Sequence, residues 1–251
     1  MIKCINTRRL EGANSLQDIC RWAVEAGFAG LELSVGGQEP VTPVMLEEGG
    51  DEILRTVKEH SLKLCSLTSS DYDLFSLAGA EGLRVEDALD HFGKLLLLSR
   101  HRKDETMVTI GAHVVRPLED IEVDSYEETF NRLYESLEEL TGRTETDGTS
   151  LALENPGGGL LLSPLELREL IDQVNSPYLG VGFNPENARQ LGNPLDWCRI
   201  LGRRIKALRV SQVRDKKEGK YLEQLDDELK PALQIINKQG WEVPVIYLGS
   251  K

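Results

Sequence analysis

Short apolar runs alternate along the chain with longer segments in which apolar residues recur at helical spacing. The apolar runs predict eight strands, and each interval between them carries a predicted helix. The predicted strands are residues 2–6, 30–35, 63–67, 113–116, 150–154, 178–183, 205–210 and 243–248. Strands that alternate with helices pair in parallel, because each helix returns the chain to the same end of the sheet.

Polar residues that can cap a helix mark several of the predicted helix starts. Ser15 precedes a helix that ends before Gly27. Ser125 and Ser163 are each followed three residues later by a glutamate, the spacing of a capping box. Proline follows Ser163, in the first helical position where no N–H is needed. Further helices are predicted over residues 51–60, 81–100 and 226–238, and from 193 onward.

This element order predicts an α/β fold, a (β/α)8 TIM barrel in one domain over residues 1–251, since about 250 residues suit that fold. An open doubly wound sheet could also use eight strands, but no G-x-G-x-x-G follows the first strand. The sequence ends three residues after Leu248, so the barrel is expected to lack its eighth helix. Four residues of strands one and eight are then expected to lack cover: Ile2, Cys4, Val245 and Tyr247. Exposed apolar patches mark interfaces, so a homodimer with its contact near the first and seventh helices is expected.

Charge and cysteine content narrow the class of partner and the compartment. The net charge is −13, which disfavours binding to nucleic acid or to an anionic membrane surface. The four cysteines form no C-x-x-C pair, which is typical of buried thiols in a reducing compartment. No signal peptide and no run of about 18 apolar residues is found. The expectation is a cytoplasmic protein.

In a (β/α)8 barrel the active site lies at the C-terminal ends of the strands. The residues at or just after those ends, most of them polar, are Asn6, Glu32, residues 66–71, Arg116, Glu154, Asn155, Asn184, Arg209, Gln212 and Leu248. Arg209 and Glu154 are expected to form an ion pair. Asp71 and Asp73 also lie near the mouth, and aspartates in such loops more often serve as turn residues.

Several motifs resemble the xylose-isomerase-like TIM-barrel family, which includes sugar isomerases and epimerases. Residues 151–155, LALEN, resemble the fifth strand of the family, and residues 178–187, YLGVGFNPEN, resemble its sixth. Residues 27–32, GFAGLE, are similar to its second strand. Residues 203–206, RRIK, and the GW at 240–241 resemble the approaches to strands seven and eight. Together these motifs occur in the family's order over nearly the whole chain.

The resemblance implies a divalent metal held by a Glu on strand five, an Asp on strand six, a His on strand seven and a Glu on strand eight. This sequence has Glu154, Asn184 and Arg209 at the first three positions. The fourth falls on Leu248, or on Tyr247 in the other register. One carboxylate and one amide cannot hold a catalytic divalent ion tightly, so no metal ligands and no cofactor are expected. The histidines are predicted far from the mouth.

Three functions follow from the resemblance and from these replacements. The first is a metal-independent isomerase, epimerase or lyase acting on a small polyol or keto compound. Glu154 would carry the proton and Arg209 would stabilise negative charge, while Glu32, Arg116, Asn155, Asn184 and Gln212 would bind the substrate. The second is a non-catalytic relative that binds a small ligand or a protein partner. The third is an enzyme of the usual metal type with a displaced site.

Overall fold

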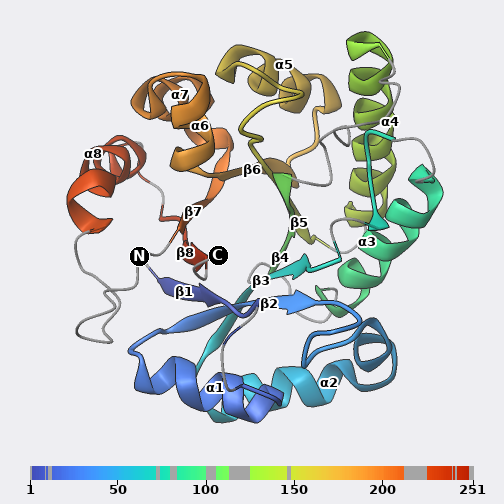
Figure 1. The fold of residues 1–251 in the computed structure, drawn as a ribbon, viewed down its shortest axis with the longest axis vertical. Helices are drawn as coiled ribbons and strands as arrows, with labels where there is room; N and C mark the ends of the chain where they lie inside the picture. Colours follow the sequence, from blue (N-terminus) through green and yellow to red (C-terminus); the bar gives the residue numbers. More distant parts are fainter. Residues whose placement is uncertain are drawn as a thin grey trace.

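The computed structural model of the protein is a closed barrel of eight parallel strands that pair in chain order (Figure 1). It describes residues 2–8, 10, 13–71, 74–79, 84–99, 106–112, 125–145, 148–211, 225–238, 240 and 242–248. The strands are β1 (Lys3–Asn6), β2 (Gly30–Val35), β3 (Lys63–Ser69), β4 (Met107–Ile110), β5 (Ser150–Glu154), β6 (Leu179–Phe183), β7 (Ile205–Ser211) and β8 (Val245–Leu248). The predicted TIM barrel is therefore confirmed.

Helices surround the barrel on its outer face (Figure 1). They are α1 (Leu16–Glu25), α2 (Pro43–Glu59), α3 (Val85–Ser99), α4 (Tyr126–Thr144), α5 (Pro164–Val174), α6 (Pro185–Leu191), α7 (Pro194–Leu201) and α8 (Leu225–Asn237). A 3-10 turn, Gly202–Arg204, precedes β7. Eight α-helices are present because α6 and α7 both lie between β6 and β7. In the described part of the chain, which reaches Leu248 at the end of β8, no helix follows β8.

The capping predictions are confirmed at two helices and need correction at a third. The Ser15 hydroxyl accepts from the Asp18 N–H at 3.1 Å, and Ser125 forms a complete capping box with Glu128. At α5 the Ser163 hydroxyl caps the helix, but Glu166 does not return to the Ser163 N–H. Its carboxylate instead accepts from the N–H of Leu162 at 2.8 Å. The second hydrogen bond of the predicted capping box is therefore made to the residue before the N-cap.

The fourth strand lies earlier than the sequence pattern predicted. β4 is Met107–Ile110, and it pairs Met107 with Ser66 of β3 and with Ser150 of β5. This position turns Val108 and Ile110 outward into the apolar core, where both are fully buried. The sequence pattern therefore placed the fourth strand too far along the chain, at residues 113–116. Those residues, which include Arg116, lie outside the described part of the chain.

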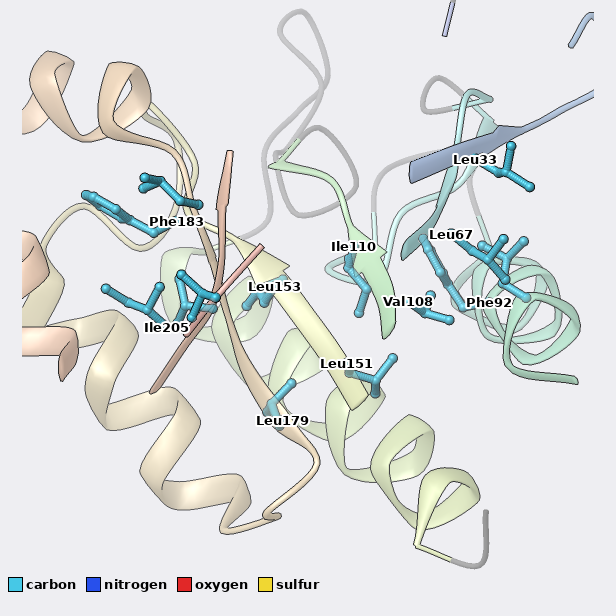
Figure 2. Packing of buried hydrophobic residues seen from close by; sticks show 14 of the residues in the cluster. Leu33, Leu67, Phe92, Val108, Ile110, Leu151, Leu153, Leu179, Phe183 and Ile205 are labelled. Atoms are coloured by element: carbon cyan, nitrogen blue, oxygen red, sulfur yellow. The ribbon is translucent and has the colours of Figure 1, made fainter. Parts of the chain in front are cut away.

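Both faces of the strands are buried, but they face different surroundings. The outward side chains of neighbouring strands pack against helices in one large cluster, in which Leu67 and Val108 lie near Phe92 of α3 (Figure 2). A second, small cluster of Cys4, Cys65, Ala207 and Ile246 lies apart from that core, with Leu248 packed against it. Because successive strand residues point to opposite faces, Ile246 and Leu248 share one face and Tyr247 has the other. Leu248, not Tyr247, therefore takes the inward position at the end of β8.

The predicted uncovered edge at β1 and β8 is absent among the residues that the structure describes. Val245 is 1% exposed and Tyr247 is 7% exposed. The ring of Phe28 meets Tyr247 edge-on with ring centroids 5.7 Å apart, and Trp22 of α1 stacks on Phe28. Cys4 is fully buried in the small cluster. The premise for a homodimer, exposed apolar side chains on β1 and β8, is therefore not met, because aromatic residues of the same chain supply the cover; the homodimer itself stays a prediction.

No helix in the described part of the chain is both long enough and apolar enough to cross a lipid bilayer.

Candidate active site at the barrel mouth

A buried guanidinium lies between two carboxylates at the C-terminal end of the barrel. Arg209 of β7 donates through Nη1 to Glu32 Oε2 of β2 at 2.5 Å. Its Nε lies 3.4 Å from Glu154 Oε2 of β5, a distance that makes an ion pair. Arg209 is 1% exposed, Glu32 is 0% and Glu154 is 6%. The predicted pairing with Glu154 is therefore present, but Glu32 is the closer partner.

Asn184 fixes the second oxygen of Glu154. Its Nδ2 donates to Glu154 Oε1 at 2.8 Å, while its Oδ1 accepts from the N–H groups of Glu186 and Asn187 and so caps α6. The cap determines which end of the amide faces Glu154. An aspartate in the same pose would turn a carboxylate oxygen toward Glu154, and two carboxylates that close need a proton or a cation between them. The amide N–H of Asn184 donates to Glu154 directly, so neither an extra proton nor a cation is needed.

Asn155 holds the backbone of Asn184 in place. Its Oδ1 accepts from the Asn184 N–H at 2.6 Å, and its Nδ2 donates to the Asn184 carbonyl at 3.0 Å. Its own carbonyl accepts from Asn187 Nδ2 at 2.9 Å, and Asn155 is 0% exposed. The side-chain amide is thus engaged with backbone on both of its atoms. These contacts give Asn155 a role in holding the chain between β6 and α6, whereas substrate binding was predicted for it.

Asn6 extends the cluster to β1. Its Nδ2 donates to Glu32 Oε1 at 2.6 Å, and its Oδ1 accepts from the Arg8 N–H at 2.9 Å. The two oxygens of Glu32 are therefore each engaged, one by Asn6 and one by Arg209. Sequence reasoning did not predict this use of Asn6. The available signal was its place as a polar residue at the end of an apolar strand, a place that Glu32 and Glu154 share. We refer below to Asn6, Glu32, Glu154, Asn184 and Arg209 as the mouth cluster.

A glycine makes room for the arginine stem. A Cβ added at Gly182 of β6 would lie 3.1 Å from Arg209 Cδ, closer than ordinary van der Waals contact. The arginine stem would have to shift by a few tenths of an ångström to admit that Cβ, and such a shift would disturb the charge-assisted hydrogen bond of the guanidinium, which needs about 2.7–2.9 Å. Gly182 therefore belongs to the same arrangement as the charged residues, although it carries no chemistry.

The donor set does not fit a divalent metal ion. Of the four positions at which the family resemblance implies ligands, the structure places Glu154 and Asn184 together, and Arg209 and Leu248 offer no ligand atom. The carboxylate oxygens are already turned toward a guanidinium and an amide N–H. Among the described residues, no group of three or more His, Cys, Asp or Glu side chains could hold a metal. A cation at this place would meet the positive charge of Arg209.

The structure does not place two of the predicted site residues. Gln212 and Arg116 are outside the described residues, so the structure does not test their predicted place at the mouth. His60 is the C-cap residue of α2, and His91 lies within α3, where its ring stacks on Phe75. Burial lowers the pKa of His91 to about 4, and burial raises the pKa of the Cys20 and Cys198 thiols to about 11 and about 12. Neutral, buried thiols of this kind are poor nucleophiles.

Comparison with known proteins gives one family and several solved structures. The family model described as "Xylose isomerase-like TIM barrel" matches residues 20–247. A 3-keto-D-glucoside 4-epimerase from E. coli has a TM-score of 0.75 at 12% identity, covering 100% of this chain and 92% of its own. A D-psicose 3-epimerase from Clostridium cellulolyticum H10, solved with D-tagatose, has a TM-score of 0.76 at 16% identity, covering 99% and 84%. The IolI protein, solved with a bound zinc atom, has a TM-score of 0.73 at 16% identity, covering 98% and 88%. No curated protein matches the sequence. At these identities the likeness to solved structures shows the fold alone.

Proposed function

Because the chain belongs to the xylose isomerase-like TIM barrel family, we propose that it acts on a small polyol or keto compound at the barrel mouth, as an isomerase, epimerase or lyase that needs no tightly bound metal. The structural neighbours named as sugar epimerases support the substrate class, since they share this barrel over nearly its full length. Three of the four positions at which the family resemblance implies metal ligands are Asn184, Arg209 and Leu248 in this chain, so the proposal does not use the metal-assisted chemistry that the resemblance implies.

The observation that carries the proposal is the cation that remains at the mouth. The Arg209 guanidinium lies at the strand-seven position where the resemblance implies a metal-ligating histidine, 3.4 Å from Glu154. Removing a proton next to a carbonyl leaves an enolate, whose negative charge must be stabilised. A guanidinium is a permanent cation with five N–H donors, so it offers that stabilisation without a metal.

Glu154 is the proposed proton carrier. It has the largest exposed fraction of the three charged groups in the mouth cluster, 6% against 1% and 0%. Asn184 and the Ala112 N–H, which donates to Oε2 at 3.3 Å, hold its carboxylate at a fixed orientation. A general base must lie within hydrogen-bond reach of the proton it takes, and a fixed carboxylate at the end of β5 meets that need.

Exchange of a carbon-bound proton with solvent tests the proposal. The protein, first treated with EDTA, would be incubated in D2O with D-fructose or D-tagatose, and the loss of the C–H signal next to the carbonyl followed by NMR. We expect exchange with the unchanged protein and none with Glu154→Gln. Glu169→Gln, an exposed residue of α5, is the matched control and should exchange normally. Exchange that survives Glu154→Gln contradicts the role given to Glu154.

The burial of the mouth cluster favours a second candidate, a non-catalytic relative that binds a small ligand. Arg209 and Glu32 are 1% and 0% exposed, and they already neutralise one another. A group that must touch an enolate has to reach it, and these two have little surface to do so. Binding of the sugars with no exchange under any condition would support this second function over the first.

A further inference from the structure

A cavity of about 570 Å³ opens beside the mouth cluster, above one side of the barrel. Its walls come from the chain that follows β1, β2 and β3, including Thr7, Gly37 and Ser70. These are C-terminal strand ends, the side of a TIM barrel on which ligands bind, and the volume lies within the range of small-molecule sites. Glu154, Asn184 and Arg209 are not part of its wall. The cavity is therefore displaced from the four positions at which the family resemblance implies metal ligands.

Hydrogen bonds connect the cavity wall to the mouth cluster. Arg8, a wall residue, donates its backbone N–H to Asn6, which donates to Glu32, which in turn accepts from Arg209. Thr7, also in the wall, accepts the backbone N–H of Ser34 through Oγ1 at 2.9 Å. Two hydrogen bonds, both made by Asn6, thus connect the cavity wall at Arg8 to Glu32.

The hydroxyl of Ser34 is a buried polar group without a hydrogen-bond partner among the described residues. Ser34 is 1% exposed, and it shares the inward face of β2 with Glu32 because alternate strand residues point the same way. A buried hydroxyl left without a partner is unfavourable, so such groups usually meet water or a ligand. Ser34 is not a wall residue itself, and its backbone N–H, which donates to Thr7, is its link to the wall.

Asp71 forms the part of the wall where two loops meet. Its Oδ2 accepts from the Gly37 N–H at 3.0 Å and its Oδ1 from the Ser70 hydroxyl at 3.2 Å. The loops approach so closely that a Cβ at Gly36 would lie 1.9 Å from Ser70 Oγ. A carboxylate accepts about four hydrogen bonds, so Asp71 retains acceptor capacity toward the cavity. The Asp71 carbonyl also accepts from the Leu74 N–H at 3.1 Å, so the turn predicted at Asp71 is present.

The charges of the wall indicate which ligands it suits. Among the wall residues that the structure describes, Arg8 contributes one positive charge, and Glu39 and Asp71 contribute two negative charges. Glu32, Glu154 and Arg209 add a further excess of one negative charge behind the wall. Phosphate and carboxylate groups would be repelled by this balance, whereas uncharged hydroxyl groups can donate to the Asp71 carboxylate. The apolar wall residues suit the C–H faces of such a compound: Leu10, Ala13, Pro40 and Leu74.

We propose that the cavity over β1, β2 and β3 is a binding site for an uncharged polyhydroxy compound, with Asp71 as a hydroxyl acceptor in its wall. The proposal rests on the proposed function for its substrate class, and it places the polyhydroxy part of the ligand on this side of the barrel, beside the mouth cluster. Asp71 determines specificity here, because its charge favours hydroxyl donors and disfavours anions.

Isothermal titration calorimetry with D-fructose, D-tagatose and D-fructose 6-phosphate tests the site. The unchanged protein is expected to bind the two free sugars more tightly than the phosphate. Asp71→Asn should weaken free-sugar binding by about tenfold. It should also reduce the difference in affinity between the free sugars and D-fructose 6-phosphate. Leu74→Trp places a large side chain at the cavity and should abolish binding. Asp196→Asn and Leu165→Trp, exposed residues on α7 and α5, are the matched controls and should bind as the unchanged protein does.

The outcomes separate this inference from the proposed function. Free-sugar binding that survives Leu74→Trp and Asp71→Asn but is lost in Glu154→Gln overturns the cavity site and leaves the proposed function standing. Binding that depends on the cavity residues, with no proton exchange, supports the cavity and contradicts the enzyme. Tighter binding of the phosphate, or no binding of either free sugar, overturns the cavity as a site for uncharged polyols.

Discussion

Removing Arg209 is the most direct perturbation of the mouth cluster. Arg209→Met replaces the guanidinium by an apolar chain and leaves two buried carboxylates, at 0% and 6% exposure, without their cation. Breaking a buried ion pair from one side costs about 3–5 kcal/mol. We expect a loss in that range in the free energy of unfolding, because burying an unpaired carboxylate costs more than the apolar chain recovers.

The two carboxylates should couple to Arg209 unequally. Glu32 accepts a charge-assisted hydrogen bond at 2.5 Å, whereas Glu154 lies 3.4 Å from Nε and also has Asn184 as a partner. A hydrogen bond to a charged group contributes about 1.5–3 kcal/mol. We therefore expect a coupling energy of about 3 kcal/mol between Arg209 and Glu32, and of about 1 kcal/mol between Arg209 and Glu154.

Double-mutant cycles measured by urea unfolding decide between these values. The variants are Arg209→Met, Glu32→Gln and Glu154→Gln, singly and in the two pairs that contain Arg209→Met. Glu32→Gln with Arg209→Met should recover most of the loss, and Glu154→Gln with Arg209→Met should recover less. Equal coupling energies, or additive losses in both pairs, would refute the geometry on which the ranking rests.

Three further expectations follow from the same structure. Elemental analysis should find substoichiometric divalent metal in the purified protein, and EDTA should leave its melting temperature unchanged; a stoichiometric ion that Glu154→Gln releases would contradict this. Gly182→Ala should destabilise by about 1–3 kcal/mol, because its Cβ would press on Arg209 at 3.1 Å, while Gly142→Ala in α4, where a Cβ meets nothing within 4 Å, should not. His91 stacks on Phe75, and burial lowers its pKa from 6.5 to about 4, so the folded state favours the neutral ring. The contribution of the neutral ring to the free energy of unfolding should be complete above pH 6.5, and the free energy of unfolding should fall by about 3 kcal/mol as the pH drops to about 4. The pH dependence of urea unfolding should flatten over that window in His91→Gln, and an unchanged slope would contradict the assignment.

The sequence by itself determined the order and type of most elements. Seven of the eight predicted strands overlap those of the structure, because each is an apolar run bounded by helices whose caps are local: Ser15 and Ser125 cap within three residues. Strand four was misplaced because MVTI at 107–110 and HVVR at 113–116 are equally short apolar runs. Only the register with β3 and β5 selects the first, since it pairs Met107 with Ser66 and Ser150.

Tertiary structure alone decided the partners at the mouth. The sequence placed Glu154 and Arg209 at strand ends but could not show that Arg209 bonds more closely to Glu32, 177 residues away. Both faces of a barrel strand are buried, so hydrophobic alternation does not tell inside from outside, which is why Cys4 was assigned to the wrong face. Which charges meet inside the barrel depends on its closure and on strand register, and these arise from contacts between segments distant in sequence.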